Sequence, residues 1–134
     1  MKKTFPKLPK IQQMILRTKD LDAAYEYCRL VENDPDVRKV IANSDSSLHA
    51  LQYCKNVSDD EDMRQVILNS SDERSGYHAY AYCNEVRHDD RMRQLIIDKK
   101  DVVAGRWYYT DCSTSEDDLP MKALSDRFPE PIEE

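Results

Sequence analysis

Four cysteines and three histidines are the side chains of this sequence best suited to nucleophilic or metal chemistry. They are Cys28, Cys54, Cys83 and Cys112, with His49, His78 and His88. The sequence holds no C-x-x-C pair, and no histidine stands at metal-ligand spacing from a cysteine. It also has no H-E-x-x-H segment, no glycine-rich phosphate loop and no recognisable nucleophile motif. We therefore expect no catalytic residues, no metal site and no cofactor, and we predict that the chain is not an enzyme.

The cysteines recur on one stripe beside tyrosine, which is typical of small buried apolar residues. In a reducing cytosol we expect them to remain thiols. Cys112 stands in a different sequence context from the others, so we predict that it is the most reactive of the four.

Carboxylates gather in four short segments, at 34–36, 59–62, 89–90 and 116–118. Exposure should keep their pKa values low, which makes them unsuited to acid–base catalysis. One interpretation is that they cap helix N-termini and complement the helix dipole. The other is that stacked helices align them into an acidic ridge, which could imitate a phosphate backbone or dock a basic protein surface.

An internal repeat places these segments. The cysteines align with one another at spacings of 26, 29 and 29 residues, and a basic residue follows each of them ten positions later. These basic residues are Arg38, Arg64, Arg93 and Lys122. An arginine once per repeat is expected to pair with a carboxylate of its own or the adjacent repeat and so to brace the stack; an anion site is the alternative.

Each repeat is predicted to contain a helix a, an acidic turn and a helix b. Helix a carries an apolar stripe at i, i+3, i+4 and i+7, as in Ala24, Tyr27, Cys28 and Val31. Helix b carries a shorter triplet, as in Val37, Val40 and Ile41, and an additional copy lies at 11–15. Helices this short cannot bury their apolar faces alone. The predicted fold is therefore an all-α short solenoid of about four repeats of 26–29 residues, with a half repeat at the N-terminus.

The fourth repeat departs from this pattern when Cys112 is aligned with the other cysteines. Asp111 then replaces the tyrosine and Ser115 the valine, and Trp107 precedes the helix. We predict that Trp107 folds over the open end of the core; the alternative is an exposed aromatic patch that also includes Tyr77 and Tyr80. The two glycines, at 76 and 105, are predicted to be turn residues between repeats.

Composition favours one helical domain. The chain has 134 residues, 40% hydrophobic content and a net charge of −6, but residues 1–19 carry six Lys or Arg and no acid. We predict a basic extended arm at 1–10, a single helical domain at 11–124 and an acidic flexible tail at 125–134. The acidic body disfavours direct nucleic-acid binding, and the sequence contains no apolar run of membrane-spanning length. We expect a cytoplasmic protein that does not engage membranes.

The repeat resembles the short helical repeats of bacteriophage and large-virus proteins. The resemblance covers residues 11–124 and rests on Tyr27, Tyr53 and Tyr82, on the valines four residues after each, and on the Asp-then-Arg turn. This chain departs from those repeats in having Cys where Ala is usual, and in placing Gly105-Arg106-Trp107 before helix a rather than after it.

The resemblance implies a phage or viral source, where small acidic proteins often bind and inhibit host or defence proteins. We expect a non-enzymatic interaction module that modulates or inhibits a host or defence protein in the host cytoplasm. One alternative is an acidic nucleic-acid mimic that blocks the DNA or RNA groove of a nuclease or CRISPR-type effector. Another is a nucleic-acid binder that uses the basic arm. The predicted partner-binding residues are Asp59, Asp60, Glu61, Asp62, Asp89, Asp90, Tyr77, Tyr80, Arg106, Trp107, Glu116 and Asp117.

Overall fold

The computed structural model describes residues 9–114 and 118–128, and every regular element within them is an α-helix. The packing divides the chain into two compact units, 1–72 and 73–134, which are described separately. The all-α prediction is confirmed. The first helix begins at residue 9 and the last ends at residue 126, so each extends two residues beyond the predicted domain limits of 11 and 124.

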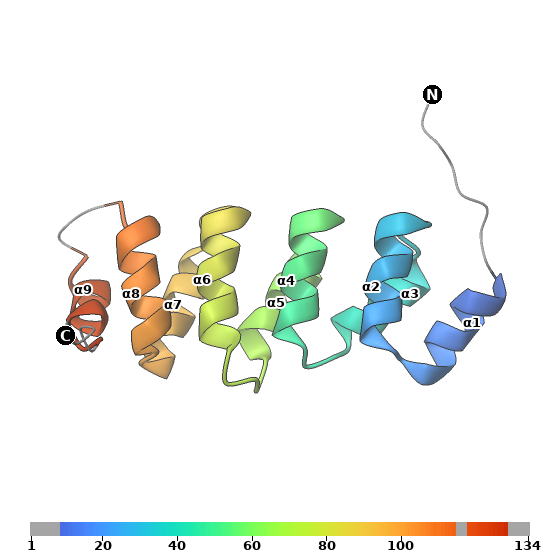
Figure 1. The fold of residues 1–134 in the computed structure, drawn as a ribbon, viewed down its shortest axis with the longest axis horizontal. Coiled ribbons are helices and arrows are strands. Elements are labelled where there is room, and N and C mark those ends of the chain that lie inside the picture. Colours follow the sequence, from blue (N-terminus) through green and yellow to red (C-terminus); the bar gives the residue numbers. More distant parts are fainter. Residues whose placement is uncertain (1–8, 115–117, 129–134) are drawn as a thin grey trace, which may run out of the picture. The chain divides into compact units, whose positions relative to one another are not determined.

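Unit 1 holds a half repeat and two full repeats. Its helices are α1 (Pro9–Thr18), α2 (Leu21–Leu30), α3 (Pro35–Ala42), α4 (Ser47–Asn56) and α5 (Glu61–Asn69). The helix pairs α2/α3 and α4/α5 form the two repeats; α2 packs on α4 and α3 on α5, while α1 packs on α2 and α3. The a-type helices α2 and α4 lie side by side with α3 and α5 behind them (Figure 1).

Unit 2 holds two further repeats built in the same way. Its helices are α6 (Ser75–Glu85), α7 (Asp90–Lys99), α8 (Val102–Asp111) and α9 (Leu119–Asp126). Here α6 packs on α7 and α8, and α9 packs on both α7 and α8 (Figure 1). Each unit therefore repeats a helical hairpin that packs on its neighbour, as in a solenoid-like repeat.

Capping residues set where the helices begin. Asp34, Asp60 and Asp89 precede the b-type helices α3, α5 and α7, and each carboxylate accepts hydrogen bonds from backbone N–H groups of the first helical turn. Asp20 and Ser46 cap α2 and α4 in the same way. The interpretation of the acidic turns as helix caps is confirmed for these three turns.

The predicted stripes form the core of each unit. In helix a the alanine and tyrosine of the first three repeats are buried, and in helix b the first apolar residue of every full repeat is fully buried. The half repeat differs, because Ile15 of α1 is buried while Ile11 and Met14 are exposed.

The fourth repeat is more regular than predicted, and the alignment on Cys112 is wrong by three residues. Val31, Val57 and Val86 are the C-cap residues directly after the first three a-type helices, and their N–H groups donate to the carbonyls of Tyr27, Tyr53 and Tyr82. In α8 the same bond runs from Cys112 N–H to the Tyr108 carbonyl.

Tyr108, which is buried, therefore takes the tyrosine position, and Cys112 takes the valine position. Helix b keeps its predicted register, since Asp118 precedes α9 as Asp34 precedes α3. The sequence between helix a and helix b is consequently three residues longer in the fourth repeat than in the others, and these residues fall between α8 and α9.

The glycines are not turn residues. Gly76 and Gly105 both lie inside helices, α6 and α8, and both are buried. A Cβ at Gly105 would lie 2.5 Å from Cβ of Leu124 in α9. Glycine at this position therefore serves the close approach of two helices. Gly105-Arg106-Trp107 also lies within helix a of its repeat and not before it.

Among the described residues, no helix combines the length and the apolar character that crossing a membrane would require.

Candidate partner-binding surfaces

The repeated arginine braces one repeat to the next, as predicted, in both units. In unit 1, Arg38 Nε donates to Asp60 Oδ2 at 2.9 Å, and its Nη2 donates to Asp60 Oδ1 at 2.6 Å and to Asp62 Oδ2 at 2.8 Å. In unit 2, Arg93 of α7 pairs with Asp118 in front of α9. The same carboxylate of Asp60 caps α5, so one side chain serves both the helix and the brace.

The remaining predicted acidic residues pair locally. Arg64 donates to Asp59 at 3.2 Å and to Glu61 at 2.7 Å, within its own repeat. Asp89 pairs with Arg91, and Asp90 lies 2.7 Å from Nε2 of His88.

The pKa values of the paired aspartates are consistent with this pairing. Burial opposes the ionisation of Asp60, but the hydrogen bonds from Arg38 and from backbone N–H groups outweigh it, so the pKa of Asp60 lies below its ordinary value. The pKa values of Asp89 and Asp118 are lowered in the same way, against burial, by Arg91 and Arg93. These carboxylates are therefore ionised and already paired at neutral pH.

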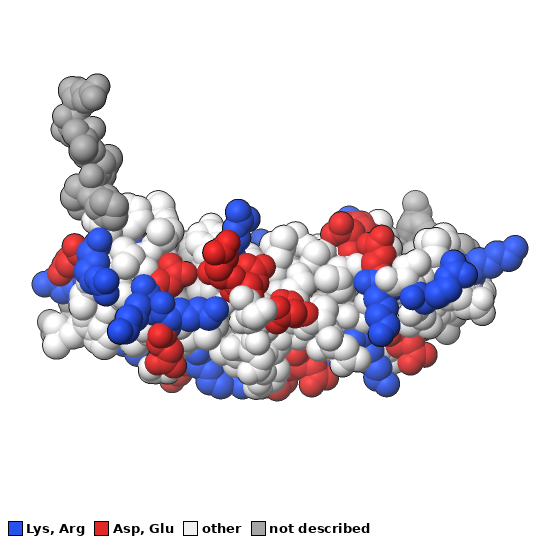
Figure 2. All heavy atoms as spheres, turned by 90° about the horizontal axis from the view of Figure 1, so that it is seen from below, with Lys and Arg blue, Asp and Glu red and all other residues white. Residues whose placement is uncertain are grey.

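The acidic ridge is thus much less acidic than the sequence indicates. The view in Figure 2 is from below, on the edge opposite the turns between helix a and helix b, and there too acidic and basic side chains stand together. The side chains of Asp62 and Asp90 remain 69% and 89% exposed and are the most exposed of the predicted partner-binding carboxylates that the structure describes. Glu116 and Asp117 lie outside the described residues, and a ridge continuous along the whole chain stays a prediction.

The predicted aromatic residues separate into exposed and buried members. Tyr77 and Trp107 are 46% and 45% exposed, whereas Tyr80 is buried. The Tyr80 hydroxyl donates to Asp111 Oδ2 at 2.5 Å, and burial together with this carboxylate raises its pKa. Tyr80 consequently supports Tyr77, with ring centroids 5.7 Å apart, and offers little surface itself.

Trp107 does not close the core, contrary to our prediction. Helix α9 covers α8 instead, through Met121 and Leu124, which are both buried. Trp107 lies one residue before Tyr108 in the repeat register, on the solvent side of α8. The neighbouring Arg106 lies over the ring of Phe128, with its guanidinium carbon 4.9 Å from the ring centroid.

Sequence reasoning missed one member of this surface. Val103, which is 49% exposed, lies four residues before Trp107 on the same side of α8. It also occupies the repeat position that Tyr77 occupies on α6, the helix that packs on α8. The corrected register would have revealed this equivalence. Tyr77, Val103 and Trp107 are together called the aromatic face.

Unit 2 also contains a groove of about 450 Å³, between the turn before α7 and residues 112–114 and 118–120. His88, Arg93, Tyr108 and Cys112 contribute to its lining, and the Tyr108 hydroxyl lies 3.5 Å from Nδ1 of His88. Burial and the charge of Asp111 raise the pKa of Cys112 to about 11. The thiol is therefore protonated at neutral pH, which does not support its predicted reactivity.

The other cysteines are similar. Burial raises the pKa values of Cys28 and Cys54 to about 11 and that of Cys83 to about 12. Cys54 and Cys83 also donate to the carbonyls of the capping residues Asp60 and Asp89. Within the described part of the chain, no cluster of three or more His, Cys, Asp or Glu residues is arranged to hold a metal ion.

Comparisons of the chain with protein-family models, with curated proteins and with solved structures each found no match.

Proposed function

We propose that this chain is a non-enzymatic protein-interaction module that binds its partner through the aromatic face of unit 2. The observation that carries the proposal is the exposure of Tyr77, Val103 and Trp107 on two helices that pack together. The other apolar stripes of these helices are buried in the core, so packing within the unit does not use these three side chains.

The residue types suit such a role. Tryptophan and tyrosine are enriched among the residues that dominate binding energy at protein interfaces. Val103 and Trp107 are four residues apart on one helix, so their side chains lie on one stripe. The proposed partner is a host or defence protein, in keeping with the resemblance to phage and viral repeats, and Asp90, on α7, adds a negative charge in the same unit.

The nucleic-acid mimic has less support, because most of the acidic side chains that it requires are paired with arginine. A mimic needs carboxylates that are available to replace phosphates. The exposed Asp62 and Asp90 are the residues on which that alternative depends.

The test is partner capture from a candidate host lysate by the tagged chain, with mass spectrometry, followed by affinity measurement on the protein identified. We expect the double variant Tyr77→Ala and Trp107→Ala to weaken binding by roughly 30-fold or more, which corresponds to about 2 kcal/mol for truncation of interface anchors. Circular dichroism should be unchanged, since both side chains are half exposed.

Leu48 supplies the matched control. It is 42% exposed on α4, at the repeat position of Tyr77. Leu48→Ala should leave binding unchanged. The proposal is wrong if the aromatic double variant binds as the wild type does, or if charge reversal at Asp62 and Asp90 abolishes binding while the aromatic variant retains it.

A further inference from the structure

Helix α1 is the b-type helix of the half repeat, and it exposes an apolar position that every other described b-type helix buries. The third residue of α3, α5, α7 and α9 is an apolar side chain with 0% exposure, whereas the third residue of α1, Ile11, is 43% exposed. In each full repeat a helix a precedes the b-type helix and packs on it. No described helix precedes α1, and this accounts for the exposure of Ile11 and Met14.

The hydroxyl of Tyr27 also distinguishes this end of unit 1 from the later repeats. The equivalent Tyr53 hydroxyl donates at 2.5 Å to Asn33, in the turn before α3. In unit 2 the equivalent Tyr108 hydroxyl lies 3.5 Å from His88, in the turn before α7. Tyr27 is 3% exposed, and its hydroxyl has no hydrogen-bond partner among the described residues. A buried hydroxyl without a partner is costly.

The repeat register locates the missing acceptor near the start of α1. Pro9 and Pro35 begin α1 and α3, so the sequence position that corresponds to Asn33 is that of Lys7, 26 residues earlier. A lysine side chain can donate hydrogen bonds but cannot accept one from a hydroxyl. The side chain at this repeat position therefore cannot replace the acceptor that Asn33 provides for Tyr53.

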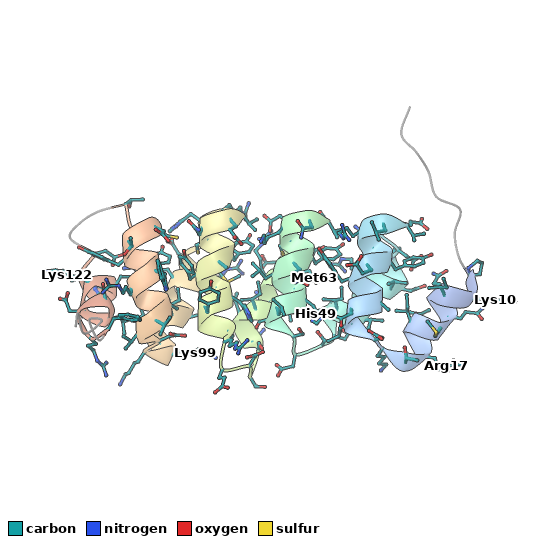
Figure 3. The ribbon with its side chains drawn as sticks, viewed as in Figure 1. Lys10, Arg17, His49, Met63, Lys99 and Lys122 are labelled. Atoms are coloured by element: carbon teal, nitrogen blue, oxygen red, sulfur yellow. The ribbon has the colours of Figure 1, made fainter. Side chains whose placement is uncertain are left out.

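Charge indicates the sign of the occupant. Residues 9–19 contain Lys10, Arg17 and Lys19 and no acidic residue. Lys10, Met14 and Arg17 stand at i, i+4 and i+7, so the two cations flank the exposed methionine on one stripe. Figure 3 labels Lys10 and Arg17 at the two ends of α1.

We propose that the exposed face of α1 docks an acidic amphipathic helix of a partner protein, which takes the place that helix a takes in the full repeats. Its apolar stripe covers Ile11 and Met14, and its carboxylates meet Lys10 and Arg17. This surface belongs to unit 1 and is independent of the aromatic face.

The chain itself supplies the probe. Residues 20–36 comprise α2 and the turn before α3, carry six acidic residues against one arginine, and include Asn33. Because α2 packs on α3, whose apolar triplet is matched by that of α1, a synthetic 20–36 peptide should dock on α1. A scrambled peptide of the same composition controls for charge alone.

Methyl NMR of methionine in the full chain provides the readout. We expect the peptide to shift the Met14 signal and to leave Met63, Met92 and Met121 in place, since those three are fully buried. Ile11→Ser, which keeps Met14 as the reporter, should weaken binding at least tenfold, while Leu30→Ser, on the exposed side of α2, should leave it unchanged. Lys10→Glu with Arg17→Glu should weaken it similarly.

Four outcomes would overturn the proposal. The Met14 signal does not shift with the peptide, or the scrambled peptide shifts it equally. The signal moves with protein concentration alone, with dimers in sedimentation, which would assign the face to a second copy. Finally, Phe5→Ser moves the signal without peptide, which would assign the face to the chain's own N-terminal residues. Trp107→Ala should not change peptide binding, so this test and that of the proposed function can fail separately.

Discussion

The carboxylate of Asp60 has two structural roles, as a helix cap and as the partner of an arginine. It caps α5 and receives a forked hydrogen bond from Arg38 of the preceding repeat, and both side chains are about four-fifths buried. Charge-assisted, geometrically fixed bonds of this kind contribute more than exposed ion pairs. Arg38 in unit 1 and Arg93 in unit 2, which have the same place in their repeats, therefore each brace two adjacent repeats.

Removing this carboxylate should be costly. We expect Asp60→Ala to lower the free energy of unfolding by about 2 kcal/mol, because the helix loses its cap and Arg38 loses its main partner. Urea denaturation monitored by circular dichroism measures it. Asp62→Ala is the matched control, since Asp62 contacts the same arginine from an exposed position and should cost less than about 1 kcal/mol. Equal losses for the two variants would contradict the assignment.

The same residues predict the pH dependence of stability. The pKa values of Asp60, Asp89 and Asp118 are lowered in the folded state, so the folded chain binds these protons less tightly than the unfolded chain. Their stabilisation is complete above about pH 4, the usual pKa of aspartate, and is lost as the pH falls through the folded-state values.

Thermal denaturation at pH values from 7 down to 2 should therefore show a fall in the melting temperature that begins near pH 4. Asp60→Asn retains a capping side chain but cannot ionise, so its melting temperature should fall less steeply. If the melting temperature of Asp60→Asn depends on pH as that of the wild type does, Asp60 does not contribute to the pH dependence of stability.

At the scale of the element, the helix-a tyrosine ties its helix to the turn of the preceding repeat. Tyr53 makes this bond to Asn33 within unit 1, whereas Tyr27 has the same place in its repeat and no acceptor among the described residues. The two tyrosines differ in hydrogen bonding while both rings are buried.

This pair permits an internally controlled experiment. Tyr53→Phe should lower the free energy of unfolding by about 1 kcal/mol, because the acceptor on Asn33 loses its donor. Tyr27→Phe should leave stability unchanged or raise it slightly, because it removes a buried hydroxyl that has no partner. Chemical denaturation of both variants measures these free energies. A larger loss of stability for Tyr27→Phe than for Tyr53→Phe would show that the Tyr27 hydroxyl has a partner.

Gly105 sets the distance between α8 and α9. Alanine favours a helix over glycine by about 1 kcal/mol, but a Cβ here would lie 2.5 Å from Cβ of Leu124. The steric cost of overpacking, about 1–3 kcal/mol, should exceed the gain, so Gly105→Ala is expected to destabilise the protein. Thr110→Ala, on the exposed side of the same helix, should stay within about 0.5 kcal/mol of the wild type. An increase in stability for Gly105→Ala would refute the close packing.

For the whole molecule, the acidic turns offer a partner fewer free carboxylates than their sequence indicates, because arginines pair with Asp59, Asp60 and Asp89. Binding through the aromatic face should depend weakly on ionic strength. We expect the dissociation constant for the captured partner to change by less than about tenfold between 50 and 200 mM salt, whereas contacts that replace several phosphates lose about 10³ or more. A steep salt dependence, with competition by duplex DNA, would favour the nucleic-acid mimic.

The sequence by itself determined the helical repeat, its apolar stripes, the caps and the arginine brace. The stripes and the caps depend on residues close together in the chain, which local periodicity and capping chemistry specify, whereas the brace, 22 residues long between Arg38 and Asp60, was predictable because the repeat recurs. The predicted alignment of the fourth repeat was wrong because it matched Cys112 to the other cysteines. Tyr108, which has the place of the repeated tyrosine, was the residue to match. An extra three residues after the helix leave no trace in its own periodicity.

Only the tertiary structure decided which equivalent residues are exposed. Ile11 and Val37 have the same place in their repeats, and so do Tyr27 and Tyr53, yet one of each pair lacks the neighbour that the other has. Burial, pairing and the availability of a hydroxyl depend on what the adjacent repeat supplies. The pattern within one repeat cannot contain that information, and for this reason the structure, rather than the sequence, added Val103 to the aromatic face, removed Tyr80 from it and identified the exposed face of α1.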